Sequence, residues 1–250
     1  MQLSELAAYL DDYLRVRDVP DSPHALNGLQ VANTGEVTRV AAAVDLCQAT
    51  IRLAVSAGAD LMVVHHGLFW EGLRPLVGAR YVRVAELVRH NIALYSAHLP
   101  LDRHPEVGNN PLLARALDVV VRGEFGNDRG VPIGVWGELN ADRATLQQKL
   151  ASVVGSVPRL MPFGPAVVRR VGIITGAGGS MIAEAVAAGL DTFITGEGSH
   201  HTYFDAEELR VNVFFAGHYA TETVGVKALA SHLNATFGLP WTFVDHPTGL

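Results

Sequence analysis

The sequence predicts an α/β fold made of two similar lobes, each with a parallel or mixed sheet flanked by helices. Two observations lead to this prediction. Short runs rich in Val, Ile and Ala alternate with stretches of helical periodicity, which is the pattern of βαβ units. In addition, the segment Ala-Val-Ser-Ala-Gly-Ala-Asp at 54–60 is similar to the segment Ala-Val-Ala-Ala-Gly-Leu-Asp at 185–191. This internal repeat indicates that both halves of the chain build similar units.

The elements of the first half are expected in a regular order. An acidic amphipathic helix opens the chain at 1–14. Strands and helices then alternate and are expected near 38–45, 46–57, 60–65, 79–90 and 92–97. Asn110 followed by Pro111 begins a further helix that ends near Asp118, because Asn is a good N-cap and Pro suits the first helical turn. Such alternation is typical of parallel strands joined by crossover helices.

A glycine-rich stretch at 122–132 separates the two halves. It contains Gly123, Gly126 and Gly130 beside Asn127 and Asp128, and no hydrophobic periodicity runs through it. We therefore predict a connection here, with a first lobe at 1–126 and a second at 127–250. The two lobes are free to interdigitate, with the C-terminal helix packing on the first.

The composition is that of an ordinary globular protein. Of 250 residues, 49% are hydrophobic and 18% are charged, which argues against long disordered regions. The net charge is −6 and no run of Lys and Arg could neutralise several consecutive phosphates, so we expect no nucleic-acid partner. No stretch approaches the roughly 18 consecutive apolar residues of a membrane-spanning helix, and no basic leader opens the chain. We expect a cytoplasmic protein without a membrane partner.

The single cysteine, Cys47, permits no intrachain disulfide and fits a reducing compartment. It falls in the first turn of the predicted helix 46–57 without an adjacent Lys or His, which predicts a buried small side chain rather than a reactive thiolate. Asp45 and Gln48 fit a capping box for the same helix, although Asp45 could instead contact a substrate. Any metal must be held mainly by nitrogen and oxygen.

The repeat brings chemically useful residues to equivalent places. The strand after 54–60 ends in His65-His66, and the strand after 185–191 ends in Gly196-Glu197. The carboxyl ends of parallel strands are where open α/β sheets gather their ligand groups.

A second pair of strands repeats the pattern. Segment 91–98 ends at His98 and segment 212–218 ends at His218, and a carboxylate follows each histidine four residues later, at Asp102 and Glu222. Each lobe thus contributes His-x-x-x-carboxylate, and the two half-sites could face each other.

Imidazole and carboxylate groups in this number indicate a binuclear metal site. Adjacent side chains on a strand point to opposite faces, but Gly67 directly after the histidine pair permits a turn through which both rings could converge. Glu222 is the candidate bridging carboxylate, and the whole set leaves coordination positions open for water. The predicted ligands of two divalent ions (Zn, Fe, Mn, Co or Ni) are His65, His66, Asp102, His218 and Glu222.

Other polar residues receive weaker assignments. His98 is predicted to orient a ligand, although it could be a further ligand itself. Glu197 belongs to the same strand end, and His200 and His201 either line the same cleft or are solvated residues at a helix start. The loop at 175–180 could cradle an anion, but its spacing matches no nucleotide-binding motif, so a tight turn is favoured. The histidines without a matched partner are predicted to be structural or exposed, namely His24, His90, His104, His232 and His246.

Five motifs spread over nearly the whole chain carry a resemblance to a known family. They are Asn27-Gly-Leu-Gln-Val31, Gly58-Ala-Asp60 leading to His65-His66, His98-Leu-Pro-Leu-Asp102, Thr195-Gly-Glu197 and Gly217-His-Tyr-Ala-Thr-Glu222. Together they resemble the NGG-interacting-factor-like family, whose bacterial members are commonly labelled GTP cyclohydrolase I type 2 homologues.

The resemblance implies a two-lobed α/β fold, a dinuclear metal centre between the lobes and a ring-shaped homohexamer. Carried over residue by residue, the metal ligands of the family fall on the five residues predicted above. The family usually has proline after the histidine pair where this chain has Gly67, which loosens the loop and leaves the ligands in place. Some members carry a large domain between the halves, which this chain is too short to hold.

The function implied by the resemblance is a dinuclear metal-dependent hydrolase acting on a nucleotide-like substrate, and the family label points to opening of the guanine ring of GTP. The same ligands would equally serve a non-catalytic metal-binding, metal-handling or interaction protein. A third hypothesis is a structural ring that uses metals for stability. No residue is assigned a catalytic role, and the metal stays open because these ligands suit several divalent ions.

Overall fold

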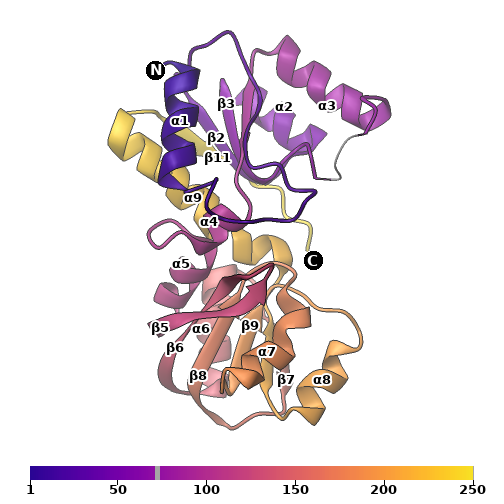
Figure 1. Cartoon of the computed structure of the whole chain (residues 1–250), viewed down its shortest axis with the longest axis vertical. Helices are drawn as coiled ribbons and strands as arrows, with labels where there is room; N and C mark the ends of the chain where they lie inside the picture. Colours follow the sequence, from indigo (N-terminus) through magenta and orange to yellow (C-terminus); the bar gives the residue numbers. More distant parts are fainter. Residues whose placement is uncertain (71–73, 250) are drawn as a thin grey trace. The chain divides into compact units, whose positions relative to one another are not determined.

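The computed structural model describes residues 1–70 and 74–249, and the chain divides into two compact units (Figure 1). Unit 1 comprises Met1–Leu101 and Gly225–His246, and unit 2 comprises Asp102–Val224 with the residues from Pro247 onward. Both units contain a β-sheet flanked by helices, so the predicted fold class is confirmed. Among the described residues, no helix combines the length and the hydropathy needed to span a bilayer.

The division lies at Leu101/Asp102 rather than at the expected 126/127. The reason is the hairpin of strands β5 (Val120–Asp128) and β6 (Val131–Asp142), which pair antiparallel through the glycine-rich stretch. Residues 122–132 are therefore part of the unit 2 sheet and do not connect the units.

Unit 1 is built on a five-stranded sheet with the order β1-β4-β3-β2-β11. Strands β4, β3, β2 and β11 run parallel, and β1 pairs antiparallel with β4. The central strands β2 and β3 are apolar until their polar ends at Asp45 and at His65-His66, as expected for strands covered on both faces. The strand bounds are β1 (Gly28–Val31), β2 (Val40–Asp45), β3 (Leu61–His66), β4 (Ala93–Ser96) and β11 (Trp241–Phe243).

Helices cover both faces of this sheet. The crossover helices α2 (Gln48–Ser56) and α3 (Gly78–Arg89) lie on one side, and α1 (Leu3–Tyr13) lies on the other (Figure 1). Helix α1 turns its apolar residues inward at helical spacing, with Leu3, Leu6 and Leu10 buried. Two further helices cross from one unit to the other in the chain, namely α4 (Leu99–Arg103) and α9 (His218–Phe237).

The predicted cap of helix α2 is wrong. The helix begins at Gln48, its N-cap is Cys47, and the Cys47 amide donates to Thr50 Oγ1 at 2.9 Å. Thr50 thus takes the role expected of Gln48, which frees the Asp45 carboxylate for another partner. Cys47 itself is half-buried at the cap rather than enclosed within the first turn.

Unit 2 is built on a six-stranded mixed sheet with the order β5-β6-β8-β9-β10-β7. Strands β8, β9 and β10 run parallel, whereas the other pairings are antiparallel. Adjacent residues of β9 point to opposite faces of the sheet. Phe193 packs in the core that includes residues of α7 and α8, and Ile194 packs in the core that includes residues of α5 and α6. The remaining bounds are β7 (Arg159–Pro162), β8 (Val167–Ile174), β9 (Thr192–Thr195), β10 (Asn212–Phe215), α5 (Asn109–Ala116), α6 (Arg143–Val154), η1 (Gly178–Met181), α7 (Ile182–Ala187) and α8 (Thr202–Glu208).

The internal repeat has a structural cause in both units. Gly58 and Gly189 follow α2 and α7 with φ of +68° and +74°, a conformation that ends a helix and favours glycine. The repeated aspartates then bind the start of the neighbouring strand: Asp60 accepts the amides of residues 38 and 39, and Asp191 accepts those of residues 169 and 170. The repeat thus fixes one helix end and one strand start in each unit.

Candidate metal centre

Three histidines meet at the carboxyl ends of the parallel strands of unit 1. His65 and His66 end β3, and His98 follows the neighbouring strand β4. One ring nitrogen from each residue lies within 4.8 Å of the other two. The ring centroid of His65 lies 4.7 Å from that of His66 and 4.9 Å from that of His98. The structure therefore groups His98 with the predicted pair.

The loop after the histidine pair depends on close packing at Gly67. A Cβ atom added there would lie 2.5 Å from the side chain of Gln30 and 2.7 Å from Ser96 Cβ. The Gln30 side chain fills this space and accepts the Leu68 amide at 2.7 Å. Gly67 is thus required for the contact with Gln30 and not for a positive φ.

The Nδ1 atom of each of these histidines is held by an oxygen atom. His65 Nδ1 donates to the Ala97 carbonyl at 2.9 Å, because a carbonyl can only accept. His66 Nδ1 bonds Asp45 Oδ1 and His98 Nδ1 bonds Asp21 Oδ1, both at 2.8 Å. A neutral imidazole that donates from Nδ1 presents the Nε2 lone pair, which is the form that binds a metal.

Asp21 is a carboxylate that the sequence did not suggest as part of the site. Burial alone would raise the pKa of Asp21, but the hydrogen bond and charge of His98, with donors from Asn27 and Ser22, hold the pKa below its ordinary value. Asp21 therefore stays ionised and fixes the His98 ring.

In unit 2, His218 and Glu222 lie one turn apart at the start of α9. His218 Nδ1 donates to Glu197 Oε1 at 2.7 Å, and His218 Nε2 lies 3.2 Å from Glu222 Oε1. Burial alone would lower the pKa of His218, but the hydrogen bonds and charges of Glu222 and Glu197 raise it to about 9. Glu197 thus fixes the orientation of the His218 ring, and this ring carries a proton that a metal would displace.

Asp102 is the second carboxylate of unit 2 and is only 6% exposed. Its Oδ1 accepts hydrogen bonds from Asn109 Nδ2 at 2.8 Å and from Thr175 Oγ1 at 3.2 Å. Neutral donors therefore hold the carboxylate oriented without neutralising its charge.

The glycine-rich loop at 175–180 supports these carboxylates. Gly176 has φ of +65°, and a Cβ atom there would collide with Glu222 Oε1. The amides of Gly176 and Gly178 donate to Thr221 Oγ1 and Thr195 Oγ1, at 3.1 and 2.9 Å. Because protein acceptors take these amides, the loop is a tight turn that positions the site rather than an anion cradle.

The remaining histidines fall into supporting or exposed positions. His200 and His201 are exposed at the start of α8, where His200 packs edge-on against Phe204 at 5.7 Å between ring centroids. His104 is buried, and its Nδ1 accepts the amides of residues 106 and 107. His232 stacks on Tyr13 at 4.1 Å between ring centroids. These contacts are structural.

The chemistry of the donor set suits a divalent metal. Four histidines, His65, His66, His98 and His218, have Nδ1 bound to oxygen and Nε2 directed elsewhere, and Asp102 and Glu222 add buried carboxylate oxygens. Among the groups that orient these histidines, the sequence pointed to Glu197 at a strand end but gave no such role to Asp21 or Asp45. Asp45 carried a signal, as a carboxylate at a strand end in register with His66.

Comparison with known proteins places the chain among relatives that share its full length. A protein of Deinococcus radiodurans named GTP cyclohydrolase 1 type 2 homolog is 44% identical, covering 98% of this chain and 94% of the relative. A protein of Halobacterium salinarum with the same name is also 44% identical, with both chains covered completely, at 100%. The solved structure of TTHA1606 from Thermus thermophilus superposes with a TM-score of 0.91 at 43% identity, again over 100% of both chains.

The family match covers the same span. Residues 1–248 match the family described as Duf34/NIF3 (NGG1p interacting factor 3). The resemblance predicted from the five motifs is thereby confirmed. The chain belongs to the Duf34/NIF3 (NGG1p interacting factor 3) family.

Proposed function

We propose that this protein is a metal-dependent hydrolase that binds a pair of divalent ions. The ligands in this proposal are His65, His66, Asp102, His218 and Glu222. The observation that carries it is the common orientation of the histidines, whose Nδ1 atoms bond to oxygen, so that Nε2 is the nitrogen that would bind a metal.

The position of the ligands in the chain supports a shared role. The chain leaves unit 1 at Leu101/Asp102 and returns to it at Val224/Gly225. Asp102 is the first residue after one crossing, and Glu222 precedes the other by two residues. Two of the proposed ligands therefore lie close in sequence to the points where the chain changes units.

The protein side chains have defined tasks in this proposal. Divalent ions bound here would act as Lewis acids and would activate water for attack on a substrate carbon or phosphorus. Asp45 and Glu197 keep His66 and His218 in the metal-binding orientation, and His218 must release its proton before it binds. The names of the relatives support a nucleotide-like substrate.

The test is product analysis with GTP on the metal-loaded protein. We expect a ring-opened or dephosphorylated product from the wild type and none from Glu222→Gln. The exposed Glu208→Gln variant serves as the control and should match the wild type. If the wild type binds metal but forms no product, the hydrolase hypothesis is contradicted and the hypothesis of a non-catalytic metal-handling protein takes its place.

We further propose self-association as a homohexamer, which the family resemblance implies. Exposed apolar residues on α3, including Tyr81 and Val88, offer a surface suited to subunit contact. Light scattering should give a mass of six 26.8 kDa chains. A monomeric mass at micromolar concentration would contradict this.

A further inference from the structure

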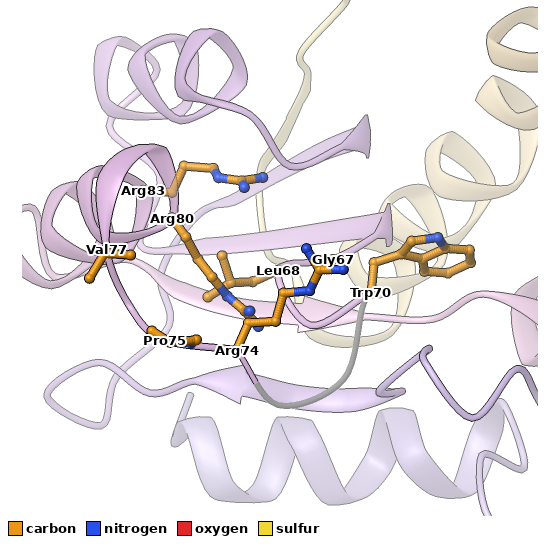
Figure 2. A pocket seen from close by; sticks show the side chains of 8 residues that line it. All are labelled: Gly67, Leu68, Trp70, Arg74, Pro75, Val77, Arg80 and Arg83. Atoms are coloured by element: carbon orange, nitrogen blue, oxygen red, sulfur yellow. The ribbon is translucent and has the colours of Figure 1, made fainter.

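A pocket in unit 1 is lined by residues of the segment 67–83, which follows the histidine pair and contributes three arginines (Figure 2). We propose that this pocket binds the phosphate group of the substrate, which makes the substrate a phosphorylated small molecule. The inference deepens the proposed function and rests on it for the identity of the adjoining site. The lining residues are Gly67, Leu68, Trp70, Arg74, Pro75, Val77, Arg80 and Arg83.

The size and charge of the pocket suit an oxyanion. Its volume is about 460 Å³, and none of the described residues that line it is acidic. Arg80 and Arg83 extend from α3, and Arg74 comes from the segment before this helix (Figure 2). Guanidinium groups bind phosphate through paired, charge-assisted hydrogen bonds, so several arginines at one pocket favour a phosphate ligand.

The start of α3 adds to the positive potential. The N-cap is Val77, which provides no side-chain hydrogen bond, and the first turn contains no acidic residue. The positive end of a helix with 12 residues therefore faces the region of Val77 and Arg80 without a compensating carboxylate in its own first turn.

The arginines are partly fixed by the protein. Arg83 Nη1 donates to the Leu46 carbonyl at 3.2 Å, while Arg83 Nε is buried and has no hydrogen-bond acceptor among the described residues. Arg80 lies over the Phe69 ring, 5.1 Å from its centroid. Such positioning lowers the entropy that the side chains lose when they bind a ligand.

Trp70 connects the arginine pocket with the histidine cluster. Its ring centroid lies 5.2 Å from that of His66 and 4.6 Å from that of His98, with the planes nearly perpendicular to the latter. A ligand with its phosphate among the arginines therefore has its other end beside these histidines. This arrangement binds the substrate by a group remote from the reacting atoms.

The first experiment measures binding of inorganic tripolyphosphate to the metal-free, full-length protein by calorimetry. Metal is removed because polyphosphates chelate cations. We expect saturable binding by the wild type and a loss of more than about tenfold in affinity for Arg80→Gln/Arg83→Gln, since each charge-assisted hydrogen bond is worth at least this factor. Arg52→Gln, exposed on α2 of the same unit, is the matched control and should bind like the wild type.

Two further measurements keep the result interpretable. Arg80→Lys/Arg83→Lys retains the positive charge, so it should bind tripolyphosphate more tightly than the glutamine variant. The lysine variant also keeps the test valid if the glutamine variant unfolds. GTP should compete with tripolyphosphate, whereas guanosine should not. Equal affinity of the glutamine variant and the wild type, absence of tripolyphosphate binding, or failure of GTP to compete would each overturn the phosphate site.

The outcome is separable from that of the proposed function. Metal content is measured on the same preparations, and the arginine variants should retain it. A wild type that binds tripolyphosphate but no metal would contradict the metal centre and leave the phosphate site standing. A wild type that binds metal but no tripolyphosphate would contradict the phosphate site and leave the metal centre standing.

Discussion

At the scale of single residues, the candidate centre depends on hydrogen bonds that select one nitrogen of each imidazole. His66 shows the principle, because its Nδ1 is bound to Asp45 on the neighbouring strand and Nε2 is therefore the nitrogen that would bind a metal. A carboxylate in this position also increases the basicity of the ring toward a metal. Substituting the groups that orient the ligands should therefore change metal binding, as substituting the ligands themselves should.

Asp45→Asn should weaken metal binding while the fold stays intact. Outer partners of metal-binding histidines typically contribute about 10–100-fold in affinity. Competition with a chromophoric chelator measures the change, and the exposed Asp12→Asn variant is the control. An unchanged affinity in Asp45→Asn would show that the Asp45–His66 hydrogen bond does not serve a metal.

His218 predicts a pH dependence with a defined sign. In the metal-free protein its pKa of about 9 exceeds the ordinary 6.5. The protonated ring therefore adds stability that is complete below about pH 6.5 and is lost as the pH rises through about 9. Metal binding must displace this proton, so metal affinity should rise with pH over the same window.

Calorimetry in buffers of different ionisation enthalpy measures the proton released. At neutral pH the wild type should release a proton from His218 on binding metal, and His218→Gln should release correspondingly fewer. Equal proton release in both proteins would contradict the raised pKa.

At the scale of elements, the parallel strands of unit 1 were predictable and the unit 2 hairpin was not. The strands expected near 38–45, 60–65 and 92–97 correspond to β2, β3 and β4, whose buried positions form uninterrupted apolar runs. Strand β5 exposes most of its residues and contains two glycines, so its sequence resembles a connection. Edge strands leave little hydrophobic pattern for a sequence to reveal.

The candidate site was predictable to a similar degree. Strand ends and the repeat pointed to the histidines and to the two carboxylates that follow them. Asp21 could not be found in this way, because it lies 77 residues from its partner His98 in a loop without periodicity. Contacts made only by the tertiary fold have no local signature.

Tyr95 on β4 ties helix α1 to the sheet. It is fully buried, and its hydroxyl donates to Asp11 Oδ1 at 2.9 Å, while burial and the Asp11 charge raise the pKa of the phenol. Tyr95→Phe should lower the free energy of unfolding by about 1.5–3 kcal/mol, the range for a hydrogen bond to a charged group. Urea unfolding measures this against Tyr81→Phe, an exposed site on α3, and equal stabilities would contradict it.

Gly176 and Gly58 form a matched pair for the loop beside Glu222. Both have positive φ, but a Cβ atom at Gly58 meets nothing within 4 Å among the described residues, whereas one at Gly176 collides with Glu222. Gly58→Ala should cost only the backbone strain of about 1–2 kcal/mol. Gly176→Ala should cost more and should also lose metal, as thermal unfolding and elemental analysis would show. Normal metal content in Gly176→Ala would show that this loop does not support the metal site.

At the scale of the whole molecule, the proposed ligands are distributed over the chain. Unit 1 contains histidines at the ends of β3 and β4, and unit 2 contains Asp102, His218 and Glu222 near the points where the chain changes units. If all the proposed ligands are needed to hold the pair of ions, loss of any one of them should lower the metal content.

The most direct test is the number of metal ions per chain, measured by elemental analysis of the wild type, His65→Ala and Glu222→Ala. Glu208→Gln is the control for the carboxylate. We expect about two ions per chain in the wild type and in the control, and a loss of both ions in each alanine variant. A wild type without metal, or two alanine variants that keep the full complement, would contradict the metal centre.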